Sequence, residues 1–389
     1  MNPDFDVLVV GAGVVGLTAA LAMAQKKLTV ALIDSGSLTV SLKTIDARVY
    51  AINRASQQLL ESLDVWPLLN KNRLSPYQYM QVWDGLTKEC LDFDARSMAQ
   101  SYLGTIIEES VLKAALLAKI NAQTLIHLFP AQAIAEVQES DGQVEVKSKD
   151  LVWTGKMLLI AEGAHSPTRK QLKVPLSQWS YQQEAIVATV TTEKKHGHTA
   201  YQVFHPTGPL AFLPLAQENQ CSIVWSTKSD KAQQLLTLDE EAFNQALTSA
   251  FQHRLGAVMV EGAKYHFPLS MRHVQQYTGK RWLLLGDAAH TIHPLAGLGL
   301  NLGLADVACW IKQIKGQHTL ANPAKALGAY QRERKAAVWQ MIALMEGLNR
   351  LFSSSAVPVA LARSLGLRLC NQLVPLKRLF ILHAAGQTE

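Results

Sequence analysis

The chain has 389 residues, of which 48% are hydrophobic and 17% charged, an ordinary globular composition in a length that suits two domains. Its formal net charge of +6 favours an anionic partner, such as a nucleotide, a phosphorylated cofactor or an anionic membrane surface. The chain lacks the dense Lys/Arg run of a nucleic-acid-binding protein. The four cysteines are far apart and form no C-x-x-C pair, which argues against a disulfide framework and favours a reducing cytoplasm.

The N-terminal residues show the pattern of a dinucleotide-binding unit. Residues 5–10 form an apolar run typical of a buried parallel strand, residues 17–25 are rich in Ala and Leu like a helix, and residues 28–33 form a second strand. The uncharged run 7–25 is not expected to be a signal peptide or a membrane span, because glycines interrupt it and the residues before it are acidic.

Three glycines in G-x-G-x-x-G spacing, Gly11, Gly13 and Gly16, stand between the first strand and the helix. Gly11 allows a tight turn, Gly13 lets the backbone approach a pyrophosphate, and Gly16 lets helix and strand pack closely. The helix N-terminus presents free N–H groups to phosphates, and Asp34 is placed to accept hydrogen bonds from ribose hydroxyls. The unit therefore predicts dinucleotide binding without deciding which dinucleotide. The alternative is a tight turn in a nucleotide-free α/β fold.

The next stretch alternates helical and strand patterns. We predict a loop at 35–44, a helix at 56–63, hairpins around Asp84-Gly85 and Asp141-Gly142, a helix at 109–119 and an apolar strand at 157–160. Arg48 either reaches the nucleotide phosphates or lies on the surface. The strand 157–160 is expected to return to the nucleotide sheet and to end at the edge where ligands collect.

Composition changes from about Trp179. Four strand patterns punctuated by Pro and Gly predict an antiparallel sheet rather than further βαβ units; they are residues 185–191, 200–204, 210–215 and 222–226. Residues 236–255 are predicted to be helical and residues 281–285 to form a strand.

That last strand leads into a second informative stretch, GDAAHTIHPLAGLGLNLGLADVACWI at 286–311. Asp287 is placed like an acid that binds a ribityl or ribose hydroxyl, and the Gly-rich segment 294–303 precedes a predicted helix at 304–314. The N-terminus of that helix suits a delocalised negative charge, such as that of a reduced flavin. His290 and His293 have no Cys or carboxylate cluster beside them, so we expect hydrogen-bonded structural or pocket residues and no metal site.

The C-terminal part, residues 330–386, is helical in pattern and basic. Within it, residues 365–382 mix leucines with Arg368, Lys377 and Arg378, which fits either a membrane-surface helix or a helix packed on the core. Because Pro375 interrupts the pattern, packing is the favoured interpretation.

Three segments together, GAGVVG at 11–16, GDAAH at 286–290 and HPLAGLGLNLG at 293–303, resemble the flavoprotein aromatic hydroxylases of the para-hydroxybenzoate hydroxylase type. Among these, the chain looks most like the ubiquinone-biosynthesis hydroxylases, through RVYAINRASQQLLESLDVW at 48–66 and AFLPL at 211–215. The resemblance covers essentially the whole chain, and the string from GDAAH to the last glycine is its most specific part.

The resemblance implies roles for individual residues. The implied FAD-binding residues are Gly11, Gly13, Val14, Val15 and Gly16 at the pyrophosphate, Asp34 at the adenosine ribose, Arg48, Glu162 and Gly163, Asp287 at the ribityl chain, and Pro294, Gly297, Leu298, Gly299, Leu300 and Asn301 at the flavin ring. Candidates for the substrate pocket are Phe204, Phe212, Leu213, Pro214, Trp225 and His293, with core packing as the alternative for each.

Three positions depart from the family pattern. Glu162-Gly163-Ala164-His165 replaces Asp-Gly followed by Ala-Arg or Ala-Asn, which bears on docking of the nicotinamide cofactor. Leu298 stands where the ubiquinone enzymes often have Gln, which bears on contacts at the flavin edge. His383-Ala384-Ala385-Gly386 stands where the family often has Arg-Ala-Met-Gly.

The implied fold is α/β: a Rossmann-like FAD-binding domain, a second, antiparallel-sheet substrate domain and C-terminal helices. The expected boundaries are 1–75, 100–178 and 272–330 for the discontinuous FAD-binding domain, 76–99 and 179–271 for the sheet domain, and 331–389 for the helical region.

The implied activity is hydroxylation of the aromatic ring of a polyprenylated phenol or quinol in ubiquinone biosynthesis. NAD(P)H or another donor would reduce FAD, and O₂ would form a flavin C4a-hydroperoxide, so no catalytic side chain is expected. Peripheral contact with the inner membrane, a ubiquinone-biosynthesis complex and a homo-oligomer are further expectations. The alternatives are a related flavoprotein hydroxylase or reductase acting on another aromatic or prenyl substrate, and a non-catalytic flavin-binding scaffold.

Overall fold

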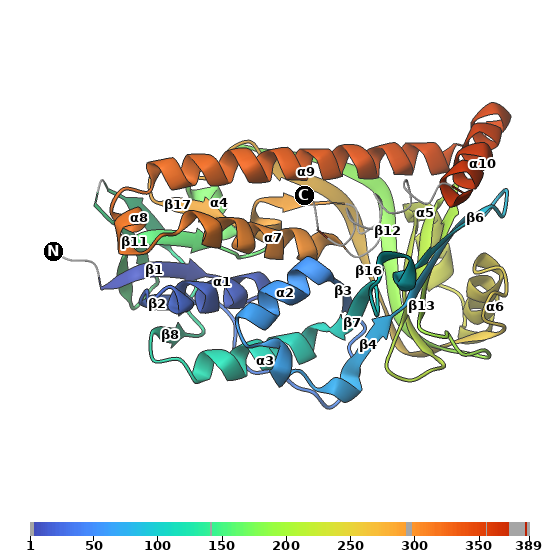
Figure 1. Cartoon of the computed structure of the whole chain (residues 1–389), viewed down its shortest axis with the longest axis horizontal. Helices are drawn as coiled ribbons and strands as arrows, with labels where there is room; N and C mark the ends of the chain where they lie inside the picture. The colour runs from blue at the N-terminus through green and yellow to red at the C-terminus, as the bar shows by residue number, and fades with distance from the viewer. Residues whose placement is uncertain (1–3, 141, 293–297, 355, 373–385, 387–389) are drawn as a thin grey trace.

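The computed structural model describes residues 4–140, 142–292, 298–354, 356–372 and 386 of the chain. Two large sheets lie at opposite ends of the molecule, and one long helix, α9 (Ala324–Ser353), runs along both of them (Figure 1). The sheet that contains β1 is mainly parallel, and the other is almost wholly antiparallel. The α/β architecture that the sequence predicts, with C-terminal helices, is confirmed.

The first sheet, which we call the nucleotide sheet, has seven strands. Five of them run parallel in the order β8-β2-β1-β11-β17, and β10 and β9 continue from β11 as an antiparallel meander. The strands are β1 (Phe5–Val10), β2 (Val30–Ile33), β8 (Ile126–Phe129), β9 (Glu136–Glu139), β10 (Val144–Lys147), β11 (Val152–Ile160) and β17 (Trp282–Leu284). The predicted return of residues 157–160 to β1 is therefore confirmed.

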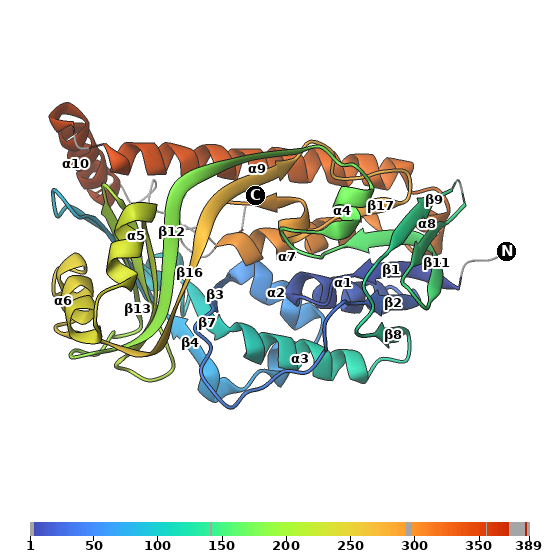
Figure 2. The same cartoon turned by 180° about the vertical axis from the view of Figure 1, so that it is seen from behind.

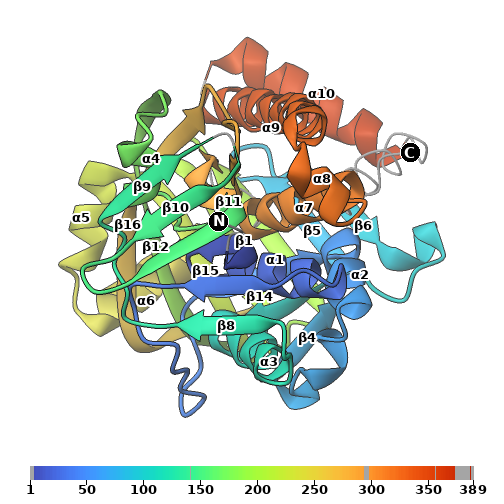
Figure 3. The ribbon, with the colours of Figure 1, turned by 90° about the vertical axis from the view of Figure 1, so that its left-hand side faces the viewer.

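Helices flank the nucleotide sheet because its central strands β1 and β2 are apolar and buried on both faces. Helix α1 lies between α3 and α7 and contacts both (Figure 3). The helices of this part are α1 (Val14–Gln25), α2 (Arg54–Ser62), α3 (Glu109–Asn121), the short α4 (Pro167–Gln171), α7 (Leu298–Gln313) and α8 (Gln317–Ala321).

The second sheet, here the large sheet, has eight strands in the order β18-β16-β12-β15-β14-β13-β5-β6, antiparallel except for β13 and β5. Its strands are β5 (Tyr79–Asp84), β6 (Cys90–Asp94), β12 (Leu176–Thr192), β13 (Thr199–His205), β14 (Gly208–Pro214), β15 (Gln220–Lys228), β16 (Val258–Val274) and β18 (His290–Thr291). The long strands β12 and β16 reach from this sheet towards the nucleotide sheet (Figure 2). Helices α5 (Ser229–Leu236) and α6 (Glu240–Ala250) cover one of its faces.

A small antiparallel sheet, β3 (Val49–Asn53), β7 (Gly104–Glu108) and β4 (Leu74–Tyr77), joins the two halves. Ala51 and Ile106 of this sheet pack against Leu213 and Leu215 of the large sheet. Short 3-10 turns lie at Trp66–Leu68, Lys71–Arg73, Ala95–Met98 and Gly286–Ala288.

Two predictions for the large sheet and its helices were wrong or incomplete. The helix predicted at 236–255 is confined to α6 (Glu240–Ala250), because the Asp239 carboxylate accepts a hydrogen bond from Ala242 N at 2.8 Å and starts the helix there, and Leu236 is already the last residue of α5. Strand β16 was not predicted, because most residues from Met259 to Pro268 are exposed on both faces and show no alternation.

The C-terminal region is confirmed as helical over α9 and α10 (Val357–Gln372), and the predicted residues 373–385 lie outside the described part of the chain. The predicted domain boundary at 330 falls inside the continuous helix α9. The division into domains stays a prediction. Helix α7 begins at Leu298, earlier than the predicted residue 304.

Candidate functional site

The glycine turn after β1 has the predicted shape. Gly11 has a φ of +102°, and a Cβ atom there would collide with the Ala161 carbonyl group at the end of β11. A Cβ atom at Gly16 would collide with the Gly11 carbonyl oxygen, whereas one at Gly13 would meet no protein atom within 4 Å. Gly11 and Gly16 are thus fixed by the fold, and Gly13 borders open space at the start of α1.

The N-terminus of α1 is not capped by a side chain, since Gly13 is the N-cap residue. Its first N–H groups therefore remain available for an anion. Asp34 braces the same turn: its Oδ2 accepts from Ala12 N at 2.5 Å and its Oδ1 from Gly36 N at 2.7 Å. The structure thus gives Asp34 a positioning role in the turn, and its contact with a ribose stays a prediction.

The second motif meets the first at Val15. A Cβ atom at Gly303 would lie 2.7 Å from Val15 Cγ2, and one at Gly286 would lie 3.2 Å from it. Gly286, with a φ of +57°, forms the turn after β17, and Gly303 belongs to α7. The start of α1, the GDAAH turn and α7 are therefore packed at one point, which joins the two predicted motifs into one site. Val14 is buried in the adjoining core.

A buried carboxylate, Asp306 of α7, holds this junction together. It accepts hydrogen bonds from Gly286 N at 2.8 Å, His290 Nε2 at 2.8 Å and Arg334 Nε of α9 at 2.6 Å. Burial raises the pKa of Asp306, but the positive charges of His290 and Arg334 more than offset it, so its pKa lies below the usual value. The structural, hydrogen-bonded role expected for His290 is confirmed. Asp306 was missed, although an acid inside an apolar helix is a signal that could have found it.

Asp287 lies in the 3-10 turn beside this network and is half-buried. Burial raises its pKa, and the nearby positive charges of His290, Arg48 and Arg272 partly counteract that rise. Arg48 itself is mostly exposed, with its Nε 3.5 Å from Glu109 and its guanidinium 5.4 Å from the centre of the Tyr50 ring. Arg48 and Asp287 are therefore close enough for their charges to attract each other.

The middle motif, Glu162 to His165, follows β11 at the same edge. Glu162 Oε2 accepts from Ser166 Oγ at 2.5 Å and from Thr168 N at 3.0 Å, so this carboxylate anchors the start of α4. Gly163 has a φ of +77°, and a Cβ atom there would meet nothing within 4 Å.

Two arginines that the sequence reasoning missed bind this motif. Arg169 donates to the Ala164 oxygen at 2.8 Å and to the Ala288 oxygen at 2.9 Å, which ties the middle motif to the GDAAH turn. Arg272 of β16 donates to the Ala164 oxygen at 3.2 Å and lies 3.3 Å from His165 Nε2. Arg169 combines a partner five residues away with one in the distant GDAAH turn, and Arg272 reaches the middle motif from β16, so neither arginine belongs to a recognisable local pattern.

The start of α7 contributes the remaining predicted residues. Gly299 has open space where a Cβ atom would be, and Leu300 packs partly against the nucleotide-sheet core. Asn301 Oδ1 accepts from Asn53 N at 3.0 Å and its Nδ2 donates to the Ala51 oxygen at 2.8 Å, which aligns α7 with β3. His293, Pro294 and Gly297 lie outside the described residues, as does the side chain of Leu298.

The predicted substrate-pocket residues divide between the two faces of the large sheet. The ring centroids of Phe212 and Phe251 are 3.6 Å apart, and those of Trp225 and Phe243 are 6.1 Å apart. Phe212 and Trp225 therefore lie in the core beneath α6, which favours a role in core packing over substrate contact. Leu213 faces the small sheet, and Pro214 is buried in β14 beside Cys221.

Phe204 is on the face towards α9, where its ring stacks on Phe352 at 4.2 Å. It belongs to an apolar group beneath α9, here the α9 cluster, whose buried members are Phe204, Met271, Ile292, Leu302, Val338, Met341, Ile342, Met345 and Phe352. Ile292 follows the GDAAH turn and Leu302 is in α7, so this cluster borders the site.

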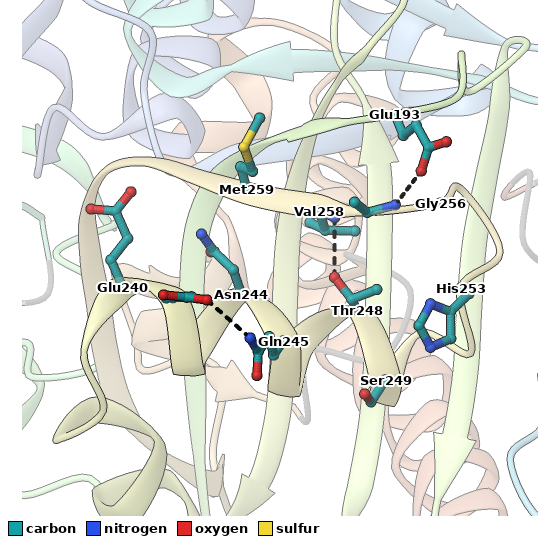
Figure 4. A pocket seen from close by; sticks show the side chains of 12 residues that line it. Glu193, Glu240, Asn244, Gln245, Thr248, Ser249, His253, Gly256, Val258 and Met259 are labelled. Carbon is teal, nitrogen blue, oxygen red and sulfur yellow. Dashed lines mark hydrogen bonds between the residues drawn. The ribbon is translucent and has the colours of Figure 1, made fainter.

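A separate cavity of about 780 Å³ lies between α6 and the first residues of β16 (Figure 4). Its polar groups bond within the protein: Glu193 accepts from Ala257 N at 2.9 Å, and Thr248 accepts from Val258 N at 3.0 Å. It contains none of the motif residues. Within the described ranges, no group of three or more His, Cys, Asp or Glu residues could hold a metal ion, and no helix is long and apolar enough to cross a membrane.

Comparisons with known proteins agree with this geometry. The pattern of the family described as FAD binding domain matches residues 4–344. The chain is 36% identical over 388 residues to the ubiquinone hydroxylase UbiL of Rhodospirillum rubrum, covering 98% of this chain and 89% of that protein. It is 33% identical over 394 residues to the 3-demethoxyubiquinol 3-hydroxylase of Escherichia coli, covering 99% of both chains.

Solved structures of low sequence identity show the same fold. The p-nitrophenol 4-monooxygenase PnpA of Pseudomonas putida superposes with a TM-score of 0.81 at 17% identity, covering 100% of both chains. PqsL of Pseudomonas aeruginosa, described as a probable FAD-dependent monooxygenase, has a TM-score of 0.75 at 18% identity, covering 90% of this chain and 97% of that one.

Proposed function

The chain belongs to the FAD binding domain family, and from this premise we propose that it hydroxylates the aromatic ring of a polyprenylated phenol or quinol precursor of ubiquinone. It is an FAD-dependent monooxygenase, and its relatives in Rhodospirillum rubrum and Escherichia coli are named as hydroxylases. The observation that carries the proposal is the junction at Val15, where the glycine turn of β1 and the GDAAH turn meet. The named substrates of the relatives support the choice of a ubiquinone precursor.

The residues at the junction fit FAD. Gly13, Gly163 and Gly299 each leave open space where a side chain would be, and Gly13 stands at an uncapped helix N-terminus. We assign the pyrophosphate to the start of α1, the adenosine ribose to Asp34, the ribityl chain to Asp287 and the flavin ring to the start of α7. When bound, FAD supplies the redox chemistry, with electrons from NAD(P)H or another donor and with O₂ as the oxidant.

The protein's own residues would position the reactants and exclude water. The positive end of the α7 dipole faces the region assigned to the flavin ring and would stabilise negative charge there. Arg169 and the Asp306 network fix the turns around that region. The α9 cluster provides an apolar surface for the substrate, and Phe204 is the candidate contact within it. Leu213, which packs against the small sheet, is a second candidate contact.

The partners and location are also proposals. We place the protein in the cytoplasm, peripherally at the inner membrane, with a ubiquinone-biosynthesis complex and a homo-oligomer as further assignments. The substrate's polyprenyl tail supports contact with a membrane, and the four cysteines, none of them in a disulfide, support a reducing compartment.

Anaerobic mixing of the FAD-loaded protein with NADH or NADPH tests whether the flavin accepts electrons. Bleaching of the yellow flavin absorbance is expected, and its absence with every donor would support a non-catalytic scaffold. That alternative retains one supporting feature, the Glu162 and His165 departures in the middle motif.

Turnover identifies the substrate class. A short-chain prenylated phenol should be hydroxylated in air, and a soluble benzoate should not. Lipid extracts of a strain lacking the protein should accumulate an under-hydroxylated quinone precursor. Turnover of the benzoate alone would replace the proposed substrate with a small aromatic acid.

A further inference from the structure

Gln202 of β13 carries an amide group that the described fold leaves without a bonding partner. The side chain is only 4% exposed, and its amide makes no hydrogen bond to any residue that the structure describes. A buried amide without a partner costs free energy, so most such groups in native proteins are hydrogen-bonded. The amide atoms of Gln202 are not fully buried, so the accessible part of this side chain includes its polar end.

Strand alternation places Gln202 on the face of the large sheet that borders the site. Tyr201 and Val203, on either side of it, pack in the core beneath α6, so Gln202 points to the opposite face. Phe204, two residues further on, shares that face and belongs to the α9 cluster. The amide therefore lies on the side of the sheet where α7 contributes Leu302 to the same cluster.

The neighbours of Gln202 on this face are apolar. Val82 of β5 and Ala211 of β14 lie directly opposite it in the two adjoining strands, and Val224 of β15 follows Ala211 in the same row. All three side chains are half-buried, and Val82 packs against the α9 cluster. These four residues thus form an apolar surface with one amide in it, the composition that a small aromatic ligand requires.

The strands around this amide carry no cation. Strands β5, β13 and β14 contain no Lys or Arg, so a ligand carboxylate held against them would find no countercharge there. A phenol or quinol ring would instead bury its apolar faces and present a neutral hydroxyl group. An amide oxygen accepts hydrogen bonds and an amide nitrogen donates them, so one Gln side chain matches such a hydroxyl group.

We infer that Gln202 binds the ring hydroxyl of the substrate, with its amide oxygen accepting the hydrogen bond and with Val82, Ala211 and Phe204 against the ring. That the ring is a prenylated phenol or quinol rests on the proposed function. The hydrogen bond fixes which edge of the ring faces the region assigned to the flavin. Gln202 is therefore a substrate-binding residue that determines specificity for a hydroxylated ring.

Binding of a matched pair of ring compounds tests this contact. Oxidised, FAD-loaded protein without an electron donor is titrated in a calorimeter with a short-chain prenylated phenol and with the same molecule lacking its hydroxyl. The parent protein should prefer the phenol about two- to tenfold, which is the net effect of one hydrogen bond. Gln202→Leu keeps the side chain's approximate size and should bind the two compounds equally.

Stability separates a ligand-binding amide from a structural one. Gln202→Leu should leave the urea midpoint of the substrate-free, FAD-loaded protein unchanged or raise it, because it removes a buried amide that bonds to no described residue. Gln252, behind the same sheet, is the control: its Nε2 donates to the Gly85 oxygen at 2.9 Å, and its Oε1 accepts from Trp83 Nε1 at 3.1 Å. Gln252→Leu should lower the midpoint and leave the preference for the phenol unchanged.

The outcomes separate the contact from the activity. No phenol preference in the parent, an unchanged preference in Gln202→Leu, or a midpoint lowered as far as in Gln252→Leu would overturn the inference. If the parent nevertheless hydroxylates the prenylated phenol, the proposed function stands without this contact. The same titrations with 4-hydroxybenzoate and benzoate cover the opposite case. If only this pair binds and Gln202→Leu abolishes its discrimination, the hydroxyl contact stands and the polyprenylated substrate is rejected. If the parent binds neither phenol, both are rejected.

Discussion

A Cβ atom added at Gly13 would meet no protein atom within 4 Å, whereas one added at Gly16 would collide with the Gly11 carbonyl oxygen. The two glycines belong to one motif, but different constraints require glycine at each position. Gly16 is required by the packing of α1 on its own turn. No described residue lies where a side chain at Gly13 would begin, so we attribute the need for glycine there to the proposed ligand.

This difference gives a prediction for a pair of valine variants. Gly13→Val should fold with near-normal stability and lose FAD binding, because its side chain would occupy the space assigned to the pyrophosphate. Gly16→Val should lower the free energy of unfolding by about 1–3 kcal/mol or more, because the added side chain overpacks the turn. Circular dichroism during urea unfolding measures stability, and flavin absorbance per mole of protein measures binding. A fully flavinated Gly13→Val protein would remove the motif's assigned role.

Asp287 gives a second prediction at the scale of one residue. Asp287→Ala should weaken FAD binding about ten- to a hundredfold, because a hydrogen bond to a charged group contributes about 1.5–3 kcal/mol. Asp287→Asn keeps the shape and should lose less. Titration of the apoprotein with FAD, followed by quenching of flavin fluorescence, measures the dissociation constant. Unchanged affinity in the alanine variant would refute the ribityl assignment.

The sequence predicted the glycine turn, Asp287 and a structural His290 because each is part of a compact local pattern. Arg169, Arg272 and Asp306 could not be assigned in the same way. Their partners, Ala164, Ala288 and Gly286 among them, are brought close only by the folded chain.

At the scale of elements, α7 and α9 are fastened by the Asp306–Arg334 ion pair, in which both side chains are almost wholly buried. Local patterns predicted most strands and helices and failed at two places. The helix predicted at 236–255 is confined to Glu240–Ala250, because Asp239 caps it, a local signal that was missed. Strand β16 lacks alternation because much of it is exposed on both faces, so it carries little of the burial signal on which such predictions depend.

Asp306→Asn should destabilise the protein by about 3–5 kcal/mol, because it leaves Arg334 buried without its countercharge. The variant also weakens the bonds that hold Gly286 and His290. An exposed ion pair, Asp94 with Arg96, provides the control: Asp94→Asn should cost no more than about 1 kcal/mol. The urea midpoint of each variant supplies the comparison, and equal midpoints would show that the Asp306 network does not stabilise the fold.

The packing of β16 against α9 also predicts a pH dependence. His273 is buried against Trp339, with their rings 4.8 Å apart, and its Nε2 lies 3.1 Å from the Tyr277 hydroxyl. Burial, with the positive charges of His290 and Lys335, lowers the pKa of His273 to about 4 from its usual 6.5. Between these values the unfolded chain binds more protons than the folded chain, so stability falls as the pH falls.

The contribution is complete above about pH 6.5, and on the order of 3 kcal/mol is lost as the pH approaches 4. Urea unfolding at pH 7.5 and at pH 5 measures the loss. His273→Gln removes the titrating group and should show a smaller difference between the two conditions. An identical pH dependence in the variant would assign the effect to other groups.

At the scale of the whole molecule, the sequence predicted an α/β protein with a nucleotide sheet, an antiparallel sheet and C-terminal helices, and the structure has this arrangement. What it did not predict is how the parts are connected. Helix α9 runs along both sheets and crosses the boundary expected at residue 330, and the small sheet β3-β7-β4 joins the two halves. These connections follow from long-range packing between faces, which no local pattern records.

The position of β17 has a consequence for how the protein is made. This strand pairs with β11 in the nucleotide sheet, yet it begins only at Trp282, and Gly303, which receives Val15, comes later still. A ribosome adds ~5–20 residues per second, so β1 and α1 wait on the order of tens of seconds for the segments that complete their surroundings. During translation the edge of β11 that pairs with β17 and the face of α1 that packs on α7 therefore stay exposed until these later segments are made. Chaperone dependence should thus be greatest for chains stalled before residue 282.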